Sequence, residues 1–142
     1  MEWAALITWV ITALFGFTML VIWLRHGGMR QEGGGKIPPW LLFGHFLLAA
    51  SGLVLWIVYV ATDADALAWV ALIVLAFDAV LGWSMFLGLA RRREALAVSG
   101  RPAGPPAAPP ERHFPVPVIA LHGLFAVTTV LLVFLAALGV GS

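Results

Sequence analysis

PWLLFGHFLLAASGLVLWIVYVA, residues 39–61, is a run of 23 residues without a single Asp, Glu, Lys or Arg. A helix needs about 20 predominantly apolar residues to cross the hydrocarbon core of a bilayer, so this run is long enough to span one. Three further apolar runs have similar length: about Trp3–Leu24, Ala66–Ala90 and Pro115–Leu138. Hydrophobic residues make up 62% of the 142 residues, and the mean hydropathy is +1.00. These values exclude an ordinary water-soluble domain and predict an all-α integral membrane protein, a four-transmembrane-helix up-down bundle.

The basic residues lie on one side of the predicted membrane. All eight are in the connections between spans one and two and between spans three and four: Arg25, Arg30, Lys36, Arg91, Arg92, Arg93, Arg101 and Arg112. Because Lys and Arg favour cytoplasmic loops, we expect loops 25–38 and 91–114 in the cytoplasm and both termini outside, in a bacterial plasma membrane. The basic residues flank helices and form no patch, so the expected partner is the lipid bilayer and not nucleic acid.

The second half of the chain resembles the first. Residues 37–51 align with residues 114–128 without a gap, and spans one and three also align. The matched pairs include Pro38 with Pro115, His45 with His122, Gly16 with Gly82, Met19 with Met85 and Arg25 with Arg91. We therefore expect one membrane domain over residues 1–142, formed by two repeated helical hairpins at about 3–61 and 66–138, with a cytoplasmic linker at about 94–113. Such hairpins share one membrane orientation, which places spans two and four diagonally across the core.

His45 and His122 are the leading candidates for chemistry. Each lies seven residues after its matched proline, so both have the same depth in the cytoplasmic leaflet. An imidazole is costly against lipid, and each ring is therefore expected to point inward. One interpretation is a hydrogen bond to Ser, Thr or a backbone carbonyl of a neighbouring helix. The other interpretation is that the two rings supply both axial nitrogens of one haem. A thiolate-bound haem is excluded, because the chain has no cysteine.

Four small or hydroxyl-bearing residues lie near the expected depth of the histidines: Gly16, Thr18, Gly82 and Ser84. Glycine lets another body approach a helix backbone closely, so these positions can make room for a porphyrin edge or can serve ordinary helix packing. Arg25 and Arg91 flank the same leaflet. They can pair with haem propionates, or they can anchor the helices at lipid phosphates.

Paired histidines on the second and fourth of four spans resemble those of the transmembrane four-helix b-type cytochromes. The resemblance covers the helical body, about 3–138 without the linker. It implies one b-type haem held by His45 and His122, and electron transfer with a quinone, a small oxidant or a redox partner subunit as an oxidoreductase. Many members carry a second haem near the other face. No histidine of this chain lies in that leaflet, so a single haem is expected.

Other readings of the same residues stay open. Met19 and Met85 can complete a two-His, two-Met copper site, although Met more often serves as adaptable packing. Asp78, near the middle of the third span, is a candidate proton relay or cation ligand, or a neutral acid bonded to Thr8, Thr12 or Trp83. The alternatives to a cytochrome are a metal or cation transport or sensing protein and a non-catalytic accessory membrane subunit. Motifs for hydrolysis, phosphoryl transfer and dinucleotide binding are absent. The sequence leaves open a homo-oligomer.

Overall fold

The computed structural model describes residues 1–30, 37–99 and 109–140. Along them lie α1 (Glu2–Arg25), the 3-10 helix η1 (Gly28–Arg30), α2 (Pro39–Thr62), α3 (Asp65–Ser99), the 3-10 helix η2 (Pro110–His113) and α4 (Val116–Ala137). Four helices are long and apolar enough to cross a membrane, and the described ranges contain no strand. The predicted all-α fold with four candidate spans is confirmed. Lys36, Arg101 and part of the predicted linker, 100–108, lie outside the described residues.

Matched prolines start the two helices that carry the histidines. Pro38 and Pro115 are the N-caps of α2 and α4, with extended ψ angles of 139° and 129°. Proline suits the start of a helix because its missing N–H would have no helical acceptor there and its ring already holds a helical φ. The two histidines therefore lie equally far from the starts of their helices.

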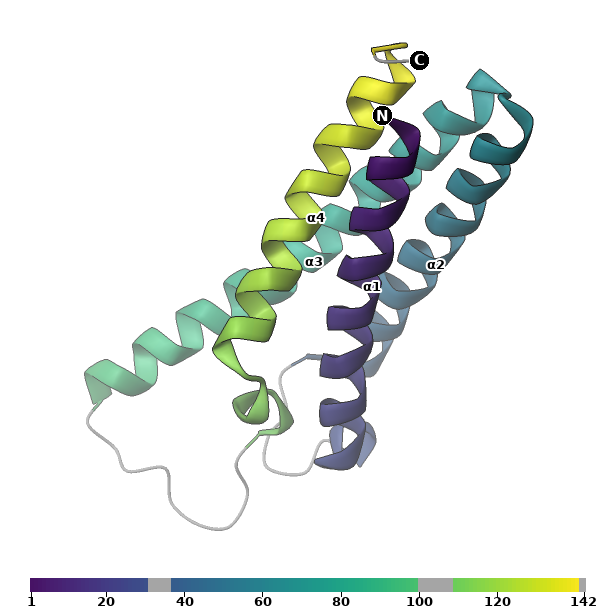
Figure 1. Cartoon of the computed structure of the whole chain (residues 1–142). Coiled ribbons are helices and arrows are strands. Elements are labelled where there is room, and N and C mark those ends of the chain that lie inside the picture. The colour runs from purple at the N-terminus through teal and green to yellow at the C-terminus, as the bar shows by residue number, and fades with distance from the viewer. Residues whose placement is uncertain (31–36, 100–108, 141–142) are drawn as a thin grey trace.

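The four helices form an up-down bundle with both termini at one end (Figure 1). We call this end the terminal half and the end with the connections α1–α2 and α3–α4 the loop half. The most extensive contacts are between α1 and α4 and between α2 and α3, while α1 with α2 and α3 with α4 touch less. This pairing fits a bundle in which α2 and α4 are diagonal. The helices of each predicted hairpin thus pack more against the other hairpin than against each other.

A core of large side chains fills the terminal half. Trp56 is fully buried, and its ring centre is 6.4 Å from that of Trp9 and 4.8 Å from that of Tyr59. Trp9 lies against Gly52 so closely that a Cβ there would be 2.9 Å from the indole Cζ2. The other buried members of this core are Ala5, Ala68, Ala71, Leu75, Val133 and Ala136. Here small residues on one helix accept large residues from the next, as is usual between transmembrane helices.

The loop half is closed by η2, inside the segment predicted as a linker. Glu111 is 2% exposed, and its Oε1 accepts hydrogen bonds from the Ile37 backbone N–H at 3.0 Å and from the Trp23 indole N–H at 3.4 Å. Trp23 is fully buried. The C-terminal part of α3 points away from the bundle, past the start of α4 (Figure 1). Thus both ends of the predicted linker are helical, and one of them is packed against α1.

Candidate functional site

His45 projects from α2 onto α3. Its Nδ1 is 2.7 Å from Oδ1 of Asp78 and 3.2 Å from the carbonyl oxygen of the same residue. A Cβ added at Gly82, one helical turn further along α3, would be 3.1 Å from Cε1 of the ring. The imidazole therefore occupies the space that the missing side chain of Gly82 leaves, and its contacts with Asp78 hold it at this register.

His122 makes the corresponding contacts from α4 onto α1. Its Nδ1 is 3.0 Å from the carbonyl oxygen of Thr12, and a Cβ at Gly16 would be 3.1 Å from its Cε1. In the sequence alignment Thr12 corresponds to Asp78 and Gly16 to Gly82. The two histidines thus contact equivalent positions of the two odd-numbered helices.

The protonation of both rings follows from their partners. A carbonyl oxygen can only accept a hydrogen bond, so Nδ1 carries the proton in each imidazole and donates it to Asp78 or Thr12. Nε2 is then the nitrogen with a free lone pair. This is the usual arrangement for a metal-binding histidine, whose other ring N–H is held by a carboxylate or a carbonyl.

The two rings lie close to each other in an edge arrangement. Their centres are 6.2 Å apart and their planes cross at 75°. An imidazole nitrogen binds a metal at about 2.0 Å and lies about 1.1 Å from its ring centre, so two rings on opposite sides of one iron have centres about 6 Å apart. The ring planes are free to differ in angle about their common axis. The spacing of the ring centres is the one expected for two imidazoles on opposite sides of one iron, and a haem held by this pair stays a prediction.

Asp78 has a different partner from those considered in the sequence. Its side chain contacts His45 instead of Thr8, Thr12 or Trp83, and the residue is 5% exposed. Thr8 and Thr12 donate their hydroxyls to carbonyls of α1, and Trp83 is 60% exposed. The sequence holds one signal for this pairing. Asp78 precedes Gly82 by one helical turn, as Thr12 precedes Gly16, so each lies one turn from the glycine that a histidine packs against.

The remaining predicted site residues are less central. Thr18 and Ser84 are exposed and donate their hydroxyls to Leu14 and Leu81 of their own helices. Gly16 and Gly82 make room for the imidazoles two residues, about half a turn, deeper than Thr18 and Ser84, so a role beside a porphyrin edge stays a prediction. Arg25 and Arg91 are exposed at the loop half. Their pairing with propionates also stays a prediction.

A copper site with the methionines stays a prediction. Met85 is half-buried and lines a cavity in the loop half, and Met19 is half-buried on α1. Within the described part of the chain, no group of three or more His, Asp or Glu side chains could hold a metal ion. A metal bound here would therefore depend on the two histidines, with or without sulfur ligands.

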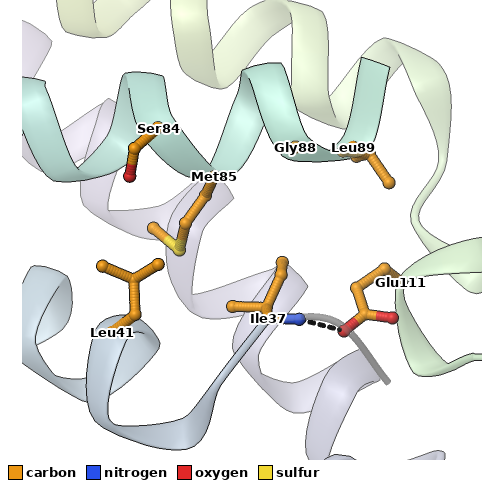
Figure 2. Close-up of a pocket in the computed structure, with 7 residues that line it drawn as sticks. All are labelled: Ile37, Leu41, Ser84, Met85, Gly88, Leu89 and Glu111. Atoms are coloured by element: carbon orange, nitrogen blue, oxygen red, sulfur yellow. Dashed lines mark hydrogen bonds between the residues drawn. The ribbon is translucent and has the colours of Figure 1, made fainter. Parts of the chain in front are cut away.

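The sequence did not predict the cavity near Met85. It has a volume of about 230 Å³ and lies between the start of α2, the second half of α3 and η2. Figure 2 shows Leu41, Ile37 and Met85 around one space, with Glu111 at its edge. Leu41 is one helical turn from His45. Glu111, at the edge of the cavity, follows a Pro-rich stretch without helical periodicity. In the sequence only its charge distinguished it from its neighbours.

Comparison with known proteins adds no identity. The chain matches no protein-family model, and neither curated proteins nor solved structures include a match. What the chain shares with the four-helix cytochromes is a bundle of apolar, membrane-compatible helices. Its function has to rest on the geometry of the site.

Proposed function

We propose that this protein is a membrane-embedded b-type haem protein that transfers electrons, with His45 and His122 as the axial ligands. One observation carries the proposal: the two rings are 6.2 Å apart, and each is held through Nδ1 by a neighbouring helix. Nε2 of each ring is thereby left for a metal. A bound haem would supply a one-electron redox centre. The protein's own residues hold the imidazoles at a fixed distance and depth and exclude water with apolar helices.

The test is the absorption spectrum of the protein purified in detergent after expression with haem supplied. We expect a Soret band that responds to dithionite and one haem per chain by the pyridine haemochrome assay. His45→Ala and His122→Ala should each lose the spectrum of a haem with two histidine ligands. The matched controls are His26→Ala and His113→Ala, because these exposed histidines form a second ring pair, with centres 3.8 Å apart, at the loop half.

Three outcomes would contradict the haem proposal. If His45→Ala or His122→Ala keeps the wild-type spectrum and haem content, the ligand assignment is wrong. Copper bound at one ion per chain without a Soret band would favour a metal transport or sensing protein, since the same spacing suits one copper(I) ion between two imidazoles. A protein that binds neither haem nor metal would be an accessory subunit in which the histidines only fix helix packing.

The orientation proposed is the one predicted from charge, with the loop half in the cytoplasm of a bacterial cell. Arg25, Arg30 and Arg112 are exposed at this half, whereas Asp63 and Asp65 lie at the terminal half. The chain has no cysteine, so single cysteines report on one site each. In intact cells, a membrane-impermeant maleimide should label Ala64→Cys and spare Met29→Cys. The reverse labelling would invert the orientation.

A lipid-soluble quinone is the redox partner we propose, with a partner subunit as the alternative. The cavity of about 230 Å³ supports it, because it lies within one turn of His45 and has a carboxyl group at its edge. Gly88 lines this cavity, and a Cβ there meets no atom within 4 Å. Gly88→Phe should slow haem reduction by a quinol and leave reduction by dithionite unchanged. Ala90→Phe is the control, because Ala90 is exposed and does not line the cavity. Equal rates of haem reduction by quinol in the wild type and both variants would exclude this cavity.

A further inference from the structure

The two halves of the histidine pair differ in one group. His45 donates its Nδ1–H to the carbonyl of Asp78 and holds Nδ1 2.7 Å from Oδ1 of the same residue, whereas His122 donates to the carbonyl of Thr12. The Thr12 hydroxyl turns away and donates to the Thr8 carbonyl at 2.8 Å. The two rings share their glycine contact, since Cε1 of each would lie 3.1 Å from a Cβ at Gly82 or Gly16. The carboxyl group of Asp78 is therefore the difference between the two ring environments.

A carboxylate beside Nδ1 of a histidine changes how strongly its Nε2 donates electrons to a metal. It draws the Nδ1 proton toward itself, which makes Nε2 a stronger electron donor to a metal. Asp78 is 5% exposed, so water would screen a charge on its carboxyl group weakly. A buried negative charge beside an iron stabilises the ferric over the ferrous state and lowers the reduction potential.

We infer that Asp78 is a positioning residue that makes His45 the stronger ligand and sets a low reduction potential for the bound haem. The inference rests on the haem site proposed above. The step it affects is the addition of one electron from an external reductant to ferric iron to give ferrous iron, with both axial bonds kept. Asp78 contacts neither the iron nor the electron donor, and it acts only through His45.

The experiment compares three variants by optical redox titration and by electron paramagnetic resonance of the ferric state. Asp78→Asn keeps the shape and an acceptor oxygen but removes the charge, and it should raise the midpoint potential while keeping the haem and both histidine ligands. Thr12→Asp places a carboxylate at the equivalent position beside His122, and it should lower the potential below that of the wild type. The exchange Asp78→Thr with Thr12→Asp should return the potential close to the wild-type value.

The outcomes separate this inference from the haem proposal. Wild-type protein that takes up no haem overturns both. Haem uptake with the same midpoint potential and the same resonance signal in wild type and Asp78→Asn overturns the inference alone. Should Thr12→Asp fail to fold, the comparison of wild type with Asp78→Asn still decides, because a purely structural role for Asp78 would change stability without moving the potential in a fixed direction.

Discussion

The terminal half of the bundle is held together differently from the loop half. In the terminal half, Trp9, Trp56 and Tyr59 interlock with small residues of neighbouring helices. In the loop half, a buried carboxylate in a 3-10 helix binds the N–H groups of two other segments, and a cavity remains beside it. The histidine pair lies between these regions. Close packing of large side chains joins the helices of one half, while the other half combines polar tethers with a cavity.

From this comparison we expect the stability of the protein to depend mainly on packing in the terminal half. Trp56→Ala removes the largest fully buried side chain of that core together with its contacts to Trp9 and Tyr59. We expect a loss of about 3 kcal/mol in the free energy of unfolding in detergent. Trp83→Ala is the control, because Trp83 is 60% exposed on the lipid-facing surface and should cost much less. Equal losses would show that the terminal half has no special role.

The tether of the loop half should contribute less. Glu111→Ala leaves the Ile37 N–H and the Trp23 indole N–H without their acceptor, and we expect it to cost about 1–3 kcal/mol of unfolding free energy. Glu111→Gln keeps an acceptor oxygen and should cost less than the alanine variant. The matched control is Glu94→Ala, at an exposed position of α3. A Glu111→Ala protein as stable as this control would mean that η2 contributes nothing to the closure of the loop half.

The smallest effect is expected for a hydrogen bond at the terminal half. The Tyr59 hydroxyl donates to Oε1 of Glu2 at 3.0 Å, which ties the start of α1 to the end of α2. Tyr59→Phe should cost about 0.6 kcal/mol, a typical value for a side-chain hydrogen bond between membrane helices. A double-mutant cycle with Glu2→Gln measures the coupling. A coupling as large as the loss in Trp56→Ala would reverse the view that packing dominates this half.

The spans and their up-down order could be predicted from the sequence because lipid demands long apolar helices, and such runs are visible without tertiary information. The matched prolines also placed His45 and His122 at equal distances from their helix starts. The rings pack against Gly16 and Gly82, beside the predicted depth, but their Nδ1 contacts with Thr12 and Asp78 lie about four residues deeper than these glycines. Residues counted inward from Arg25 and Arg91 ignore how far one helix is shifted along another, and that shift depends on side-chain packing.

Two features of the structure were not predicted from the sequence, for different reasons. The pairing of Asp78 with His45 needs the relative rotation of α2 and α3, although the spacing of Asp78 and Gly82 was a usable signal. The burial of Glu111 had no such signal, because the linker lacks the periodicity that reveals a packed face. The haem itself stays a proposal that spectroscopy has to test.

The missing side chains of Gly16 and Gly82 have a consequence for how the centre can be adjusted. Each glycine seats one imidazole, and a methyl group added at either position would lie 3.1 Å from Cε1 and displace that ring by a few tenths of an ångström. The two glycines therefore act as independent spacers behind the two histidines. Adding one methyl group on α1 or α3 alters the gap between the imidazoles while both histidines are kept.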